Sequence, residues 1–515
     1  MEDIPDVLQR RGPDHKSCLH DSSSNVTVTI MATVLHMRGK EIEKQPKELD
    51  CGKLCWNGEI YQYISSEDSS LLEVPPDQSD TDVVAQLLSE EMHMHSNDSS
   101  STSTMEAVAA AMSRIWNGEF AFCFLTENAL YYGRDCLGRR SLLTSQENDG
   151  VWKLFSVATS LNESWLELPP GRIFEYNLTN HAIQSLPLPT QTIPPMLSDN
   201  DVPACVIQAP CDVSETMWQA SIRFEHILRR AVHRRLTSCH SKDPIGVMFS
   251  GGLDSVVLAA MAASFLQKGQ TLELYNVGFG SGVAADRQAG LACYRELQAL
   301  YPEAEIKLVL VDINDWESVV NEEKRVQLLI SPKTSVMDLN IGTALWFASR
   351  GVGLLNGAPF HSDAKILILG MGADEQLGGY GRHRKAHRDG TLREELDLDI
   401  NRIWERNMGR DDRLLSDHGK EARFPYLDPN VIQFLAHVPV DDICDFTAEP
   451  GRGDKRILRL VAQRMQLTTA SGLVKRAIQF GSRIAHLSDK QRFGSRRQAK
   501  GTSHFAGKQQ VPQTD

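Results

Sequence analysis

The sequence lacks the features that mark membrane, secreted and zinc-finger proteins. No stretch approaches the ~20 consecutive apolar residues that a membrane-spanning helix needs, so we expect no membrane contact. The first residues, Met1 to Ile4, are acidic and lack an apolar run, so we expect neither a signal nor a transit peptide. None of the ten cysteines stands in a Cys-x-x-Cys pair, the spacing typical of zinc sites. Scattered reduced thiols are typical of a cytoplasmic protein, and we expect that location.

Positive charge is in deficit. Fifty-four Lys and Arg residues stand against 67 Asp and Glu residues, which gives a formal net charge of −13. Because affinity for nucleic acids depends on a cationic surface, this balance argues against a nucleic-acid partner. The 515 residues are enough for two or three domains, each with a core of its own. Composition gives no indication of the oligomeric state.

The first 185 residues read as short strands separated by turn signals. Strands are expected at 26–37, 54–63, 119–125, 129–134, 151–157 and 172–178. Helices are expected at 81–93 and 105–116, with a polar, mobile loop at 95–104 between them. A run of strands with few helices predicts an antiparallel β-sandwich over residues 1–185.

The rest of the chain changes character after residues 186–213, which are rich in proline and are expected to form a linker. Apolar strands and helical patterns then alternate, which predicts an α/β domain with a parallel sheet over 214–486. Its expected strands are 245–249, 272–279, 306–313 and 366–369, and beyond 390 the pattern is helical throughout. Residues 487–515, with basic residues among Gly, Ser and Gln, are expected to be a disordered tail.

The strongest chemical signal is one string that follows an apolar strand and opens a helix: Phe249-Ser250-Gly251-Gly252-Leu253-Asp254-Ser255. Adjacent glycines let the backbone turn its N–H groups toward an anion, and a helix N-terminus adds a positive dipole. The serine hydroxyls can donate to phosphate oxygens, whereas Asp254 would repel phosphate unless it held a bridging Mg²⁺. The alternative is a plain strand-to-helix turn with a capping residue. The complete string in this context favours phosphate binding.

This string resembles the pyrophosphate loop of the asparagine synthetase family, whose members cleave ATP between its α and β phosphates. A second loop also matches: Leu369-Gly370-Met371-Gly372-Ala373-Asp374-Glu375. The resemblance implies that loop 249–255, Val277, Leu369 and Gly370 bind ATP and that Asp254 and Asp374 hold magnesium. It also implies that Asp374 and Lys455 are catalytic, with Lys455 stabilising the departing pyrophosphate. Standing alone, Lys455 would read equally well as an exposed helix lysine.

Upstream, a series of short strings resembles the class II glutamine amidotransferases in order and spacing. They are Arg11-Gly12-Pro13-Asp14, Asn57-Gly58-Glu59-Ile60-Tyr61, Ser79-Asp80-Thr81-Asp82, Asn117-Gly118-Glu119-Phe120-Ala121-Phe122, Gly133-Arg134-Asp135-Cys136-Leu137-Gly138-Arg139-Arg140 and Leu168-Pro169-Pro170-Gly171. The resemblance implies a glutamine site at Asn57, Gly58, Glu59 and Asp80. Asn57 and the Gly58 N–H would form the oxyanion hole, and Asp80 would hold the α-amino group. If the resemblance is set aside, Asn57-Gly58 is typical of a hairpin turn, and Ser79-Asp80-Thr81-Asp82 is typical of a helix cap.

Three positions depart from the family pattern. The amidotransferase nucleophile is an N-terminal cysteine whose own α-amino group is the base. This sequence begins Met1-Glu2, so we expect a shortened form with an inactive glutaminase half. Counting back from Gln45-Pro46 places Val34 where the glutamine-binding arginine is expected. Met371 replaces a glutamate of the acceptor side, and its thioether has no charge and is only a weak acceptor.

The resemblance implies ATP-dependent amidation of aspartate through a β-aspartyl adenylate, with nitrogen from glutamine or ammonia and with ATP and Mg²⁺ as cofactors. The partners would therefore be small-molecule substrates. Two other interpretations stay open. A catalytically impaired ATP-binding or scaffold protein is favoured by the three departures, and a synthetase adenylating another carboxylic acid would be permitted by Met371. The complete phosphate loop, Asp374 and Lys455 favour an enzyme.

Overall fold

The structure is a computed structural model of the whole chain. It describes residues 4–22, 26–97, 103–146, 150–189, 209–211, 213–238, 243–281, 284–449 and 451–493. Residues 98–102 of the predicted loop at 95–104, most of the predicted linker and residues 494–515 lie outside these ranges. The two ends of that predicted loop are corrected, because residues 95–97 end one helix and Thr104 begins the next. None of the described helices is long and apolar enough to cross a membrane.

The N-terminal half is built on a seven-stranded antiparallel sheet. Its strands are β12 (Ile183–Pro187), β11 (Arg172–Asn177), β7 (Ala129–Arg134), β6 (Asn117–Leu125), β4 (Gly52–Ile64), β3 (Lys47–Leu49) and β5 (Leu71–Glu73), which pairs with β4. Helices α2 (Asp80–Asn97) and α3 (Thr104–Ser113) pack on one face. That face buries alternate side chains of β6, namely Phe120, Phe122 and Phe124, against apolar residues of both helices.

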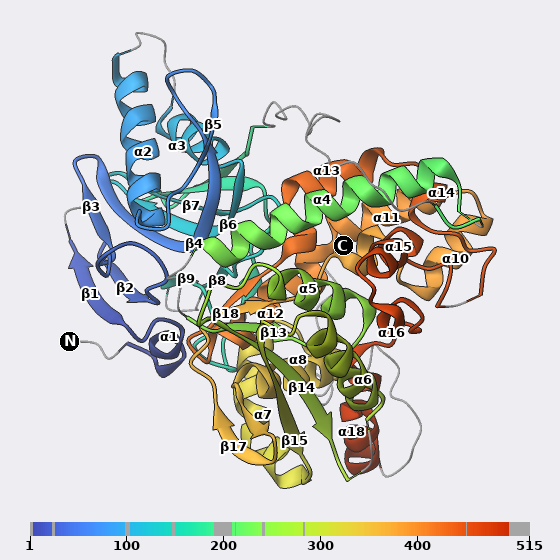
Figure 1. Cartoon of the computed structure of the whole chain (residues 1–515). Helices are drawn as coiled ribbons and strands as arrows, with labels where there is room; N and C mark the ends of the chain where they lie inside the picture. The colour runs from blue at the N-terminus through green and yellow to red at the C-terminus, as the bar shows by residue number, and fades with distance from the viewer. Residues whose placement is uncertain are drawn as a thin grey trace.

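The opposite face is covered by two smaller antiparallel sheets. Strands β1 (His15–Asp21) and β2 (Val28–Val34) form one, next to helix α1 (Asp6–Arg11). Strands β8 (Leu143–Gln146), β9 (Trp152–Phe155) and β10 (Leu166–Glu167) form the other. A cavity of about 1170 Å³ is lined by both β2 and β9 and by the facing side chains of the large sheet. Antiparallel sheets are therefore present in this half as predicted, with the second layer in two pieces (Figure 1).

The C-terminal half contains a mixed sheet in the order β17-β16-β15-β14-β13-β18-β19. Five strands are parallel: β13 (Ile245–Met248), β14 (Thr271–Phe279), β15 (Glu305–Ile313), β18 (Ile366–Ile368) and β19 (Glu421–Arg423). The expected purely parallel sheet needs two corrections. A hairpin, β16 (Val352–Leu355) and β17 (Ala358–His361), adds antiparallel strands at one edge, and β19 extends the other edge inside the region expected to be helical.

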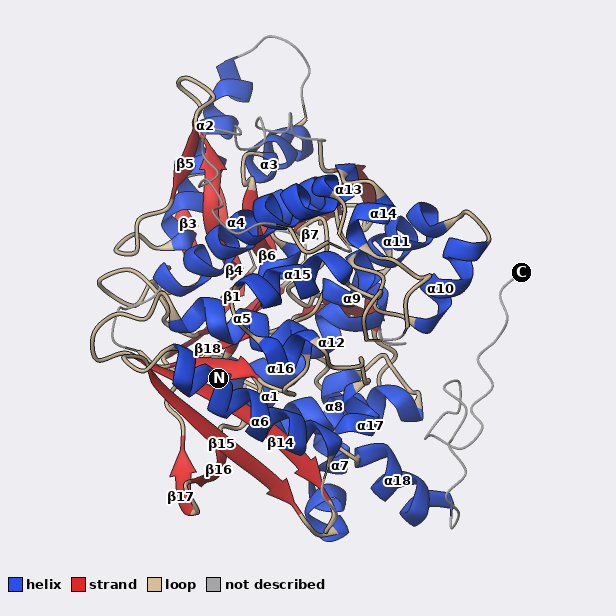
Figure 2. Ribbon diagram, turned by 45° about the vertical axis from the view of Figure 1, so that its right-hand side comes forward, coloured by secondary structure: helices blue, strands red, loops and turns tan. Residues whose placement is uncertain are grey.

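Helices cover both faces of this sheet because alternate strand residues are apolar on each side. On one face lie α4 (Glu215–Thr237), α5 (Leu253–Ala263), α6 (Ala285–Leu300), α13 (Pro429–His437) and α15 (Arg456–Arg464). On the other lie α7 (Trp316–Ile330), α8 (Val336–Ser349) and α12 (Gly409–Ser416). Figure 1 shows α6 and α7 on opposite sides of β14 and β15, and Figure 2 shows the helical layer in front of them.

Short helices complete the C-terminal half. They are α9 (Ala373–Gln376), α10 (Gly381–Arg388), α11 (Leu392–Asn401), a π-helix (Trp404–Met408), a 3₁₀ turn (Pro425–Leu427), α14 (Val440–Ile443), α16 (Thr468–Ser471), α17 (Ile478–Gly481) and α18 (Ile484–Phe493). Helix α18 corrects the predicted tail, because residues 487–493 are helical. Helix α18 packs against α8 and β14, which supplies the apolar contacts that the isolated sequence did not reveal.

The two halves meet across a buried ionic interface. Asp428, which is fully buried, accepts hydrogen bonds from Arg234 (2.9 Å) and Arg235 (2.8 Å) of α4 and from Asn117 (2.9 Å) of β6. Burial opposes the charge of Asp428, yet the two guanidinium groups hold its pKa far below the ordinary value. Further pairs across the interface are Arg423–Glu59, Arg11–Asp412, Arg140–Glu421 and Arg413–Glu167.

Candidate active site

The predicted phosphate loop turns at the carboxyl end of β13 and opens α5. Gly251 has a φ of +77°, and a Cβ on it would lie 2.3 Å from the Gly290 nitrogen of α6, so only glycine fits. Ser250 Oγ accepts from Gly252 N at 3.2 Å, and Ser255 Oγ donates to Gly252 O at 3.0 Å. The two hydroxyl oxygens are 3.5 Å apart. The loop therefore presents both hydroxyls beside the N-terminus of an eleven-residue helix.

The second glycine-rich loop follows β18, the strand next to β13, and packs against the first. A Cβ on Gly370 would lie 3.1 Å from Asp254 Cβ, which shows how closely the loops approach. A Cβ on Gly379 would lie 1.9 Å from Asp374 Oδ1, so a side chain at this position would displace that carboxylate. The two predicted aspartates are thus brought to one edge of the sheet by adjacent parallel strands.

Lys455 joins these aspartates. Its Nζ lies 2.6 Å from Asp254 Oδ2 and 2.7 Å from Asp374 Oδ1, and its side chain is 2% exposed. Lys455 precedes α15 with a φ of +53°, a left-handed conformation that is uncommon for a residue with a Cβ. Backbone strain of this kind is typical of functional sites. The backbone conformation and the two ion pairs therefore hold the Lys455 ammonium group against Asp254 and Asp374.

Three more charged residues reach the same centre and were not found in the sequence. Lys475 contacts Asp374 Oδ2, and Asp286 and Arg476 lie in the same cavity wall. Burial raises the pKa of Asp286 to about 7, against the attraction of Arg476 and Lys475. Burial lowers the pKa of Lys475, against the attraction of Asp254 and Asp286. These residues belong to α6 and to the segment after α16, and no contiguous motif connects them with the glycine-rich loops.

A cavity of about 750 Å³ lies over this centre. Most of the predicted ATP residues line it: Phe249, Ser250, Asp254, Ser255, Val277, Leu369, Gly370 and Asp374. Gly251, Gly252 and Leu253 belong to the same loop but do not line the cavity. Lys455 does not line it either and contacts the carboxylates of Asp254 and Asp374. The volume is in the range of small-molecule sites.

The aspartates fit the predicted magnesium. Asp254 and Asp374 already converge on one cationic nitrogen, which lies 2.6 Å from Asp254 Oδ2 and 2.7 Å from Asp374 Oδ1. Within the described part of the chain, no group of three or more His, Cys, Asp or Glu residues could hold a metal ion. Two carboxylates suit Mg²⁺, which is commonly bound by one or two carboxylates together with the phosphates of a nucleotide.

The π-helix and residues of and after the second loop also line the cavity. Glu405, Arg406 and Asn407 of the π-helix line the cavity together with Met371 and Tyr380. Tyr380 donates to Glu375, a buried carboxylate that also accepts from Asn407 Nδ2 at 3.4 Å. Short π-helical segments occur frequently at functional sites. Met371, where the family pattern has a glutamate, therefore lines the same cavity as the two aspartates.

The predicted glutamine residues gather around the larger cavity of the N-terminal half, which Asn57, Gly58, Glu59 and Asp80 all line. Arg38, a residue that the sequence did not single out, forms ion pairs with the carboxylates of Glu59 and Asp80. Its Nη1 lies 2.9 Å from Asp80 Oδ1 and 3.3 Å from Glu59 Oε1, and it donates to Ile60 O at 2.8 Å. Val34 lines the same cavity as a buried apolar side chain. Asp80 therefore has a cationic partner from its own chain.

Comparison with known proteins shows the family to which the chain belongs. A family model described as asparagine synthase matches residues 223–396 and 386–470. "Asparagine synthetase domain-containing protein 1" of Bos taurus is 32% identical, with 94% of this chain and 93% of that protein covered. The protein of the same description from Homo sapiens is 30% identical, with 94% and 92% covered. The chain belongs to the asparagine synthase family.

A more distant member of the asparagine synthase family is "Asparagine synthetase [glutamine-hydrolyzing] 1" of Arabidopsis thaliana, which is 25% identical over 67% of this chain. Membership confirms the resemblance read from the sequence and implies the use of ATP and of small-molecule substrates.

Proposed function

We propose that this chain is an ATP-dependent ligase that adenylates a carboxylic acid and converts the adenylate to an amide, with aspartate as the first acid to test. The observation that carries the proposal is the convergence of Ser250, Asp254 and Asp374 on one cavity, with the buried Lys455 from a third segment in contact with both aspartates. A strand-to-helix turn without a ligand needs no second aspartate and no buried lysine aimed at it. The convergence supports a polyphosphate site.

The chain's own residues divide the work. The N-terminus of α5 and the hydroxyls of Ser250 and Ser255 would bind phosphate oxygens. Lys455 would stabilise the negative charge that develops as pyrophosphate leaves the α-phosphorus. Asp254 and Asp374 would hold Mg²⁺, which when bound offsets the charge of the phosphates. The acid's carboxylate would attack from the wall that carries Met371, and ammonia would then attack the adenylate and release AMP.

Ammonia is the nitrogen donor that we propose for this chain. Asp80, the residue expected to hold the α-amino group of glutamine, is paired with Arg38 at 2.9 Å. A glutamine amino group at Asp80 Oδ1 would compete with a guanidinium that is itself buried and makes a further hydrogen bond to Ile60 O at 2.8 Å. Leaving a buried charge without its partner is costly.

A second acid is favoured by one observation. Met371 lines the cavity, where its side chain adds apolar surface and no charge. An apolar side chain at this position favours an acid with an apolar portion over aspartate, which carries a second carboxylate and an ammonium group. We therefore propose a ligase for a less polar acid as the alternative.

The test is release of pyrophosphate from MgATP across a panel of carboxylic acids, with ammonium as nitrogen donor. Aspartate should stimulate release if the first proposal holds, and a less polar acid should do so if the alternative holds. Asp374→Asn should abolish the stimulated release because it removes one magnesium ligand and the partner of both lysines. If no acid stimulates release while MgATP still raises the melting temperature, the chain is a nucleotide-binding protein without this activity.

A further inference from the structure

Two cysteines lie directly opposite each other in the seven-stranded antiparallel sheet. Cys55 of β4 is the register partner of Cys123 of β6, and the register of these strands is continuous from Lys53 to Ile60. Directly opposite residues of an antiparallel pair have Cα atoms about 4.5 or 5.5 Å apart. Both separations lie within the range of about 4.4–6.8 Å that a disulfide spans. The backbone therefore already holds the two residues at a separation that a disulfide can bridge.

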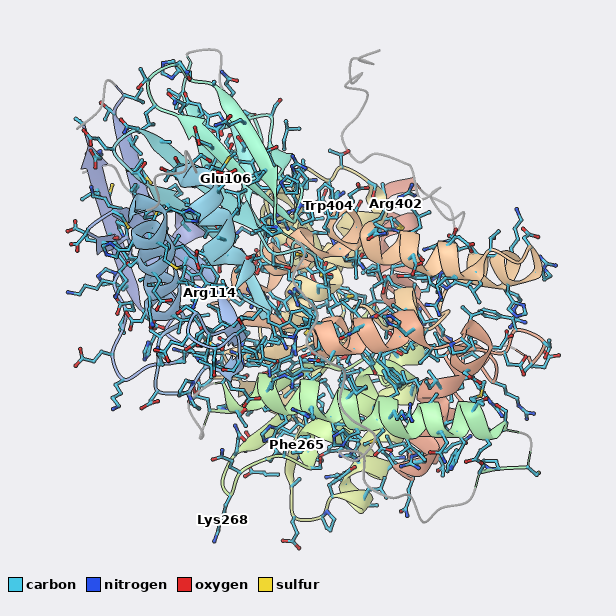
Figure 3. The ribbon with its side chains drawn as sticks, turned by 90° about the horizontal axis from the view of Figure 1, so that it is seen from above. Glu106, Arg114, Phe265, Lys268, Arg402 and Trp404 are labelled. Atoms are coloured by element: carbon cyan, nitrogen blue, oxygen red, sulfur yellow. The ribbon has the colours of Figure 1, made fainter. Side chains whose placement is uncertain are left out.

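Both thiols point away from helices α2 and α3. The residues next to them in each strand, Trp56 and Phe122, are buried in the core under these helices. Glu106, in the first turn of α3, identifies that helix in Figure 3. Because successive residues of a strand point to opposite faces of the sheet, the two thiols project from the other face.

On that face the two cysteines line the cavity of about 1170 Å³ between the sheets. Cys123 and Trp152 of β9 pack against the same apolar cluster. Both cysteines are free thiols and are partly buried. A small molecule that enters this cavity therefore meets both sulfurs together.

The two sulfurs are not equivalent. A hydrogen bond from the Cys55 thiol lowers the pKa of Cys123, against the effect of burial, and a hydrogen bond from the Cys55 backbone lowers it further. The hydrogen bond to Cys123 and burial together raise the pKa of Cys55. Because the thiolate is the reactive form of cysteine, Cys123 is the nucleophile of the pair and Cys55 keeps its proton.

We propose that Cys55 and Cys123 form a reversible disulfide when a hydroperoxide enters this cavity. The Cys123 thiolate attacks one peroxide oxygen and the O–O bond breaks. With hydrogen peroxide, the departing hydroxide takes a proton from solvent, which leaves water and a sulfenic acid on Cys123. The Cys55 sulfur then attacks the sulfenic sulfur, the S–O bond breaks, and the hydroxide leaves with the Cys55 proton as a second water.

The step is balanced, because the two thiols lose two electrons and one peroxide is reduced to two waters. It requires no nucleotide and no carboxylic acid. Neither cysteine lines the nucleotide cavity, so the inference is independent of the proposed function.

The test exposes the reduced full chain to hydrogen peroxide, blocks the remaining thiols with iodoacetamide and maps the peptides by mass spectrometry without reduction. The wild type should give a peptide pair joined through Cys55 and Cys123, and dithiothreitol should restore both thiols. Cys136→Ser is the matched control, because Cys136 is an exposed thiol of the same half of the chain. This variant should form the same link as the wild type.

Two further variants separate the two steps of the reaction. Cys55→Ser keeps a hydroxyl donor but cannot form the disulfide, so dimedone, which reacts with sulfenic acids, should label Cys123. Cys123→Ser removes the nucleophile, so dimedone labelling of the pair should be lost. Circular dichroism melting of the reduced proteins checks that both variants are folded, and the peptide map of the wild type does not depend on them.

Three outcomes would overturn the inference. The first is that Cys55 and Cys123 both remain free thiols at a peroxide concentration that oxidises Cys136, because reactivity would then follow exposure alone. The second is a link from either residue to a different cysteine in place of the proposed pair. The third is equal dimedone labelling of the pair in Cys55→Ser and Cys123→Ser, which would show that Cys123 is not the nucleophile.

Discussion

Lys455 Nζ lies between two carboxylates, 2.6 Å from Asp254 and 2.7 Å from Asp374, although these aspartates come from loops 120 positions apart in the sequence. A single cation thus keeps two acidic groups close together before any ligand arrives. If Lys455 is removed, the carboxylates are left to repel each other in a partly buried site.

Lys455→Met should therefore change both stability and catalysis. Without ligand, its melting temperature should fall, with a loss of about 1–3 kcal/mol in the free energy of unfolding. Millimolar Mg²⁺ should restore more stability to this variant than to the wild type, because a divalent cation can replace the missing charge. Acid-dependent pyrophosphate release should fall about 10²–10³-fold. Equal stabilisation of both proteins by Mg²⁺ would contradict the placement of the metal between these aspartates.

Asp286 should make stability depend on pH. Burial raises its pKa from 3.8 to about 7, so between these values the folded protein binds a proton that the unfolded chain does not. The free energy of unfolding should therefore decrease as pH rises from about 4 to 7 and then level off for this group. Asp286→Asn removes that contribution.

The difference between wild type and Asp286→Asn isolates the effect from all other titrating groups. In urea titrations the variant should gain stability relative to the wild type on going from pH 5 to pH 8, by up to about 3 kcal/mol. A difference that stays constant over this range would show that Asp286 is ionised throughout.

Asp428 should hold the two halves in one cooperative unit. Asp428→Ala leaves Arg234 and Arg235 buried without their shared carboxylate, which should cost about 3–5 kcal/mol. The wild type should melt in a single transition, and the variant should melt earlier or in two steps. Calorimetry distinguishes these outcomes. An exposed aspartate such as Asp397 serves as the control, since Asp397→Ala should shift the melting temperature very little.

Glutamine should be a poor nitrogen donor for this chain. Because Arg38 is paired with Asp80 and Glu59, glutamate release from glutamine should stay at background while ammonium supports the reaction. Arg38→Met should not create a glutamine site, since it leaves the buried Asp80 without its cation and Glu59 with Arg423 alone, and it should destabilise the N-terminal half. Glutamate release that depends on added enzyme and is lost in Asp80→Asn would contradict this role for Arg38.

How much of this could be predicted from the sequence depends on how far apart the cooperating residues lie. Loop 249–255 carries its whole geometry in seven consecutive residues, so its place between β13 and α5 could be predicted. The strand β19 could not, because three residues suffice for it only beside β18, and its charged residues Glu421 and Arg423 find their partners across the domain interface.

The residues of the candidate site also separate into those that a local motif identified and those that it did not. Asp254, Asp374 and Lys455 were identified through the motifs around them, and the structure places them together. Lys475 and Arg38 were missed because their partners are 101 and 42 positions away. Only the folding of the chain brings them into contact, and neither stands in a string with a chemical signature of its own.

The nucleotide product formed with MgATP, ammonium and the stimulating acid tests the central claim most directly. If the cavity over Asp254, Asp374 and Lys455 adenylates a carboxylic acid, chromatography should find AMP and pyrophosphate in equal amounts, both absent without the acid and both lost in Lys455→Met. ADP and inorganic phosphate as the products would mean that ATP is cleaved at the wrong bond for an adenylate, and the proposed function would be contradicted.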